Sequence, residues 1–144
     1  MQACNGQNAA APCPIRFSRA GERPLHVDDV EAAVAFYTTK LGFTLISSAA
    51  PAFADVSRGE LRLLLSGATS SAGRAMPDGR VPAAGGWNRI QLVVDDLPAE
   101  VQRLRSMGVR FRNEIVSGPG GSQILVEDPS GNVIELFQPR GRAG

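Results

Sequence analysis

The feature that most constrains this chain is an internal repeat, because it requires a fold built from two similar units. Residues 25–43, LHVDDVEAAVAFYTTKLGF, and residues 92–111, LVVDDLPAEVQRLRSMGVRF, share a strand end, a double aspartate, an amphipathic stretch and a glycine. A chain of 144 residues can bury one core or form two small modules that share a sheet. The repeat favours two modules.

Each copy of the repeat predicts one α-helix between its aspartates and its glycine. In the first copy, Asp28 or Asp29 caps the helix, Glu31 forms a capping box with Asp28, and Gly42 ends the helix. The predicted apolar stripe of this helix is Val30, Val34, Tyr37 and Leu41.

The second copy predicts a helix by the same signals. Asp95 or Asp96 caps it, Pro98 is tolerated in its first turn, and Gly108 ends it. The predicted apolar stripe is Leu97, Val101, Leu104 and Met107.

Strand-like runs complete each unit and predict a βαβββ plan that occurs twice. They lie at 43–47, 52–57 and 60–65 in the first unit and at 110–116, 122–127 and 132–138 in the second. The expected organisation is a tail at 1–14, a first module at 15–66, a linker at 67–87, a second module at 88–140 and a tail at 141–144. The linker is rich in Gly, Ala, Ser and Pro, and it is either a solvated crossing or a lid over a site.

The composition excludes several classes of partner. The net charge is +1 and the arginines are scattered, so neither nucleic acid nor a membrane surface is an expected partner. No apolar run approaches the roughly 18 residues of a membrane span, and the first residues lack the pattern of a signal peptide. We therefore expect a cytoplasmic protein. Cys4 and Cys13 lie in the predicted tail as free thiols, without a zinc-site spacing.

One carboxylate stands out in the last predicted strand. Val133, Glu135 and Phe137 share one face of that strand, while Ile134 and Leu136 share the other. Burying an unpaired carboxylate costs several kcal/mol, so Glu135 needs a cation, a metal, a hydrogen-bonded partner or a wet rim.

Two motifs in these units resemble a known family. VDDVEAAVAFYTTKLGF early and EDPSGNVIELFQP late are similar to the signatures of the vicinal oxygen chelate superfamily, which includes glyoxalase I, bleomycin-resistance proteins and extradiol dioxygenases. The resemblance covers about residues 22 to 139. It implies an α+β fold whose two βαβββ modules form a curled mixed sheet, a cup around a small-molecule site. It also implies a homodimer.

The resemblance identifies positions that hold a divalent metal in the metal-dependent members. Those positions fall on Glu22, Arg89 and Glu135, and on Leu63 or Leu64 in the last strand of the first unit. A guanidinium has no lone pair to give to a metal, and leucine has no ligand atom. Glu22 and Glu135 are therefore metal ligands only in an alternative interpretation.

Other residues are candidate ligand-binding groups with a structural alternative for each. His26 lies on the same face as Glu22 and either contacts a ligand or is satisfied at the strand end. Gln91 and Gln123 either hydrogen-bond a ligand or face solvent. Trp87 either lines the pocket or packs as a hinge anchor, and packing is our prediction.

Three functions remain open from the sequence. We favour a metal-free cup that binds a small molecule, with no cofactor and with Arg89 paired to Glu135. The alternative is a metal-dependent lyase, isomerase or dioxygenase of the glyoxalase I type. Metal-independent catalysis by Glu135, Arg89 and His26 is a third hypothesis.

Overall fold

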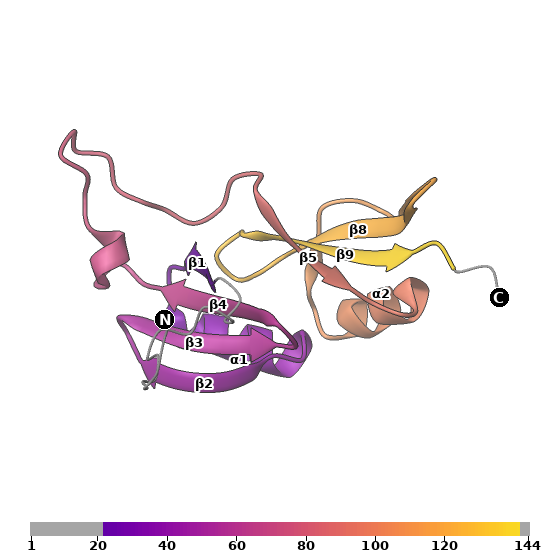
Figure 1. The fold of residues 1–144 in the computed structure, drawn as a ribbon, viewed down its shortest axis with the longest axis horizontal. Coiled ribbons are helices and arrows are strands. Elements are labelled where there is room, and N and C mark those ends of the chain that lie inside the picture. Colours follow the sequence, from indigo (N-terminus) through magenta and orange to yellow (C-terminus); the bar gives the residue numbers. More distant parts are fainter. Residues whose placement is uncertain (1–21, 142–144) are drawn as a thin grey trace, which may run out of the picture.

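The first module is a four-stranded sheet with one helix on it. A computed structural model describes residues 22–141, and the predicted tails lie outside the described residues except for Gly141. In sheet order β1-β4-β3-β2, the outer strand β1 runs parallel to β4 and the other neighbours are antiparallel (Figure 1). The elements are β1 (Glu22–His26), α1 (Val30–Lys40), β2 (Thr44–Ala49), β3 (Phe53–Arg58) and β4 (Leu61–Ser66).

The second module repeats this plan with a five-stranded sheet. Its order is β5-β9-β8-β6, with β7 also paired to β8, and β5 runs parallel to β9. The run predicted at 110–116 divides into two short strands. The elements are β5 (Arg89–Val93), α2 (Leu97–Ser106), β6 (Arg110–Phe111), β7 (Val116–Gly118), β8 (Gly121–Glu127) and β9 (Val133–Pro139). The predicted α+β class with two modules is confirmed, and within residues 22–141 the two sheets remain separate.

Both helices are capped by the second aspartate of their repeat. The Asp29 carboxylate accepts a hydrogen bond from Ala32 N at 3.1 Å, and the Asp96 carboxylate accepts one from Ala99 N at 3.1 Å. Asp28 is therefore not the cap, and the capping box predicted on it is absent. Neither helix is long and apolar enough to span a membrane, a statement that covers the described residues only.

The buried faces of the helices differ in part from the predicted stripes. In α1, Ala33 and Phe36 are buried beside Val30 and Tyr37, while Val34 is only partly buried. In α2, Met107 at the C-cap is 36% exposed. Met107 lies beyond Ser106, the last residue of α2, whereas Leu41, the last predicted position of the first stripe, is buried in the core.

The linker leaves the body of the molecule as an extended arm (Figure 1). Apart from a short 3₁₀ turn at Ser71–Gly73, the segment between β4 and β5 has no regular structure. Its outer bend is closed by a hydrogen bond from Met76 N to Arg80 O at 2.7 Å. The arm is an exposed crossing between the modules rather than a folded element.

The turn at residues 128–132 joins the two modules. The hydroxyl of Tyr37 in α1 donates to the carboxylate of Asp128 at 2.8 Å. Asn132 Nδ2 donates to the carbonyl of His26 at 2.8 Å, and the Ser130 hydroxyl accepts from Asp28 N at 2.8 Å. The side chains of the DPSGN segment therefore hold the first module against the second.

Candidate functional site

The candidate site is the face of the second sheet that α2 does not cover. Ile90, Ile134 and Leu136 point toward α2 and are buried in the core. Because strand side chains alternate, their neighbours in sequence point to the opposite, open face. The strand register arranges the open face in rows: Arg89, Val133, Glu127 and Arg110 form one row, and Gln91, Glu135 and Leu125 form the next.

Glu135 is the buried acid of this face, and its first partner is Gln91. The residue is only 7% exposed. Its Oε1 accepts a hydrogen bond from Gln91 Nε2 at 2.8 Å, and its Oε2 lies 3.8 Å from Arg89 Nη1. The predicted pair of Arg89 and Glu135 is present, but the shorter contact is with the amide. Glu135 thus has one partner for each carboxylate oxygen.

Most of the N–H donors of Arg89 are not used by Glu135. Its side chain is 42% exposed, and its contact with Glu135 is long for a charge-assisted bond. A guanidinium has five N–H donors in a planar fork. Arg89 therefore presents unused donors to solvent above a fixed carboxylate.

A second cluster lies at the start of β5 and was missed by the sequence-based prediction. Arg112 Nε donates to Glu127 Oε2 at 2.6 Å, and the Arg112 guanidinium lies 4.5 Å from the centre of the Trp87 ring. Trp87 is 76% exposed, so the predicted packing role is wrong. The signal available in the sequence was the pair Arg110 and Arg112, two residues apart, although β6 ends at Phe111 and Arg112 lies beyond it.

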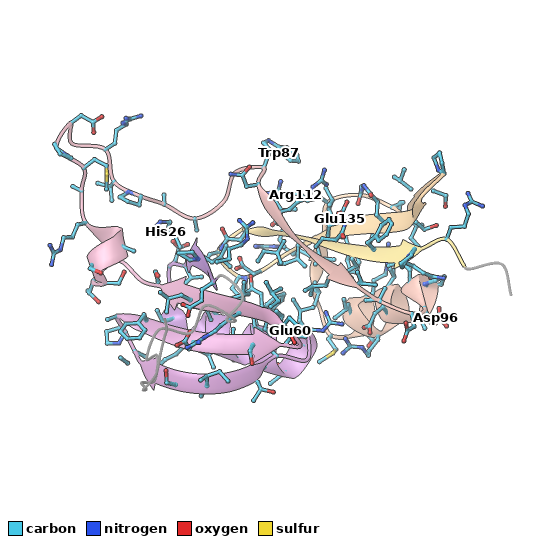
Figure 2. All side chains as sticks on the ribbon, viewed as in Figure 1. His26, Glu60, Trp87, Asp96, Arg112 and Glu135 are labelled. Carbon is cyan, nitrogen blue, oxygen red and sulfur yellow. The ribbon has the colours of Figure 1, made fainter. Side chains whose placement is uncertain are left out.

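The remaining predicted residues lie elsewhere. Glu22 does not share the Arg89 cation; its Oε2 lies 3.3 Å from Arg62, which also contacts Asp55 at 2.9 Å, on the first sheet. His26 is at the end of β1 and lies apart from Glu135, over the other module (Figure 2). Gln123 is opposite Phe137 across β8 and β9, two residues from the Glu135 row. One chain therefore brings together Arg89, Gln91 and Glu135 only.

The residues around Glu135 do not fit a divalent metal. Among residues 22–141 there is no group of three or more His, Cys, Asp or Glu side chains that could hold an ion. The position in β4 that corresponds to Glu135 is Leu64, because Leu64 pairs with Pro24 as Glu135 pairs with Gln91. Within the described part of one chain, Glu135 has a guanidinium and an amide N–H beside it rather than further ligands.

Comparisons with known proteins agree with this architecture. A model of the Glyoxalase/Bleomycin resistance protein/Dioxygenase superfamily matches residues 19–136. The uncharacterized protein YwbC of Bacillus subtilis (strain 168) is 31% identical over 124 residues, which cover 78% of this chain and 90% of YwbC.

Two solved structures show the same fold. A lactoylglutathione lyase from Agrobacterium tumefaciens has a TM-score of 0.68 at 24% identity, over 84% of this chain and 93% of that chain. TnmS3, an antibiotic binding protein from Streptomyces sp. CB03234, has a TM-score of 0.62 at 26% identity, over 87% of this chain and 100% of that chain.

Proposed function

The chain belongs to the Glyoxalase/Bleomycin resistance protein/Dioxygenase superfamily, and from this premise we propose that it is a metal-free binding protein for a small anionic molecule. The observation that carries the proposal is the position of Arg89, whose guanidinium lies beside the buried carboxylate of Glu135 and faces solvent with donors to spare. The similarity to TnmS3, an antibiotic binding protein, supports binding as a function of this fold.

Binding follows from the chemistry of three side chains. Gln91 holds the Glu135 carboxylate in one orientation by a hydrogen bond. The Glu135 carboxylate in turn attracts the Arg89 guanidinium and limits the positions that this side chain adopts. A carboxylate, phenolate or polarised carbonyl of a ligand then accepts the remaining guanidinium hydrogens. When no ligand is bound, the Glu135 carboxylate balances the charge of Arg89, so no isolated cation is buried. When a ligand binds, its anionic group gains hydrogen bonds from the guanidinium.

A titration with benzoate, followed by calorimetry, tests the anchor. We expect Arg89→Gln to weaken benzoate binding about tenfold or more, since a hydrogen bond to a charged group contributes about 1.5–3 kcal/mol. Arg80→Gln is the matched control, because Arg80 lies on the exposed linker and pairs with Asp78. Equal affinities of the wild type and Arg89→Gln for benzoate would refute the proposal.

The burial of an acid on β9 favours one competing function, a metal-dependent lyase, isomerase or dioxygenase in which Glu135 is a ligand. Elemental analysis after incubation with Mn²⁺, Zn²⁺ or Ni²⁺ and gel filtration separates the two. We expect no ion in stoichiometric amount. A stoichiometric ion that Glu135→Gln loses would establish the competing function instead.

We also propose that the chain forms a homodimer. The two sheets of one chain remain separate, and the open face of the second sheet carries Val93, which is 56% exposed. A second copy would cover such apolar area. Multi-angle light scattering should give twice the mass of the chain, and a monomer at micromolar concentration would remove this proposal.

A further inference from the structure

We infer, resting on the proposed function, that Trp87 is a stacking surface for the ligand, and that the ligand is therefore a planar aromatic anion. In this arrangement its ring lies on the open side of the Trp87 indole and its anionic group meets Arg89.

Trp87 is exposed in a way that needs a reason. It is the chain's only tryptophan, and 76% of it is accessible, the highest value among the exposed large hydrophobic side chains of the described residues. Leaving an indole in water forfeits the burial of a large apolar surface. A ligand that covers the ring recovers that free energy on binding.

The indole is exposed but not loose. One side of its ring faces the Arg112 guanidinium, at 4.5 Å from the ring centre. Arg112 is itself fixed, because it donates to Glu127 Oε2 at 2.6 Å, to Gly131 O at 3.2 Å and to Gly86 O at 3.3 Å. The Arg112 side chain is only 20% exposed. A ring held in this way loses little freedom when a second ring stacks on it.

Trp87 lies just before β5, and Arg89 is the first residue of that strand. They are two residues apart at the entry to β5, and Arg112 ties Trp87 to Glu127, which shares a row with Arg89 through Val133. Figure 2 shows Trp87 above Arg112 at the edge of the second sheet, on the side where Glu135 lies. One molecule of modest length can therefore touch the indole and the Arg89 guanidinium.

The charge of this region selects an anion. Three guanidinium groups, of Arg89, Arg110 and Arg112, face the carboxylates of Glu127 and Glu135, which leaves one positive charge in excess among these five side chains. The Arg110 side chain is 63% exposed and the Arg89 side chain 42%, so both are open to a ligand. An aromatic ring with a carboxylate or phenolate complements both the indole and this charge.

Calorimetric titrations with three probes test the inference: 2-naphthoate, which is planar and anionic, cyclohexanecarboxylate, which is anionic without an aromatic ring, and 2-naphthamide, which is aromatic and neutral. We expect 2-naphthoate to bind tightest. Trp87→Leu should weaken 2-naphthoate about tenfold, within the range of ring stacking on an aromatic side chain, and should leave cyclohexanecarboxylate unchanged. Trp87→Phe should restore most of the affinity, because it restores a ring.

A second measurement reports contact directly. Trp87 supplies the only indole N–H signal in a ¹⁵N-labelled protein, and 2-naphthoate should shift that signal while cyclohexanecarboxylate does not. A Trp87→Leu protein that binds 2-naphthoate as tightly as the wild type overturns the stacking role. If Arg89→Gln still abolishes binding in that case, the proposed function stands without it. If no probe binds the wild type, both fail.

Discussion

The hydrogen bond between Tyr37 and Asp128 should be a main stabiliser of the joint between the modules. Tyr37 is fully buried, and its hydroxyl donates to Asp128 Oδ2 at 2.8 Å. The Asp128 carboxylate is 1% exposed and also accepts from Ser130 N, Asn132 N and Asn132 Nδ2, each at 2.9 Å. Tyr37→Phe removes one of these four donors and leaves the others in place.

The expected cost follows from that count of donors. A hydrogen bond to a charged group contributes about 1.5–3 kcal/mol. Because three donors still hydrogen-bond the Asp128 carboxylate in Tyr37→Phe, we expect the lower end of this range, about 1.5 kcal/mol. For a domain of this size the melting temperature should fall by about 5 °C. Asp128→Ala should cost more, about 3–5 kcal/mol, because it leaves several buried donors without an acceptor.

Alkaline titration gives an independent assay of the same bond. Burial, together with the Asp128 carboxylate, raises the pKa of Tyr37 well above its ordinary value of 10.0. Below about pH 10 the phenol is neutral in both the folded and the unfolded states, so this contribution to stability is fully present. Above that pH only the unfolded state ionises, and the free energy of unfolding should fall by about 1.4 kcal/mol per pH unit from this group.

The chain contains one tyrosine, so the tyrosinate absorbance that appears during an alkaline titration reports Tyr37 alone. Tyrosinate should appear only as the circular dichroism of the helices is lost, and Tyr37→Phe should show a shallower loss of stability above pH 10 than the wild type. Reversible ionisation near pH 10 in a protein that keeps its helical signal would refute the buried bond.

Three further substitutions test other parts of the structure. Gly121→Ala should destabilise by more than about 3 kcal/mol, because Gly121 has φ +151° and a Cβ there would lie 2.9 Å from Pro139 Cα; Gly120→Ala, with no atom within 4 Å of its Cβ, should be nearly neutral in chemical denaturation. Asp96→Ala should cost about 1 kcal/mol as the loss of a helix cap, whereas Asp95→Ala should not, and equal effects would contradict the cap assignment. Arg89→Ala should cost only about 0.5–1 kcal/mol, since half-exposed ion pairs contribute little, and a coupling to Glu135→Gln above about 2 kcal/mol in a double-mutant cycle would show that the pair is tighter than its 3.8 Å contact indicates.

The parts of the fold that local signals specify were predictable from the sequence. Caps, glycine stops and strand alternation act within a few residues, so both helices and most strands lie within a few residues of their predicted bounds. The errors have separate causes. Asp28 lies one residue before the cap residue Asp29, and its N–H bonds to Ser130, more than one hundred positions away. Met107 lost its place in the core because α2 rotates it toward solvent.

The candidate site was predictable in its faces but not in its contacts. Period-two alternation placed Arg89 and Gln91 on one face of their strand, and the family resemblance placed Glu135 near Arg89. The parallel pairing of β5 with β9 puts Gln91 directly opposite Glu135. Glu135 lies closer to Gln91 than to Arg89 because of that register. The sequence of one strand does not specify how it is paired with the next. The contact between Trp87 and Arg112 joins residues that are far apart in the sequence, because Arg112 reaches the ring from beyond β6.

The two modules share a plan but compensate charge in different ways. In the second sheet, Glu135 on β9 is held by Gln91 and Arg89 from β5. In the first sheet, the position that matches Glu135 is Leu64, and the acid lies instead one strand further on, where Asp55 of β3 pairs with Arg62. Each open face therefore carries a carboxylate beside a guanidinium, although the residues do not superpose in the repeat. An alignment of the two repeats alone would place no acid in the first module at the position of Glu135. The strand register shows that the acid lies on the neighbouring strand instead.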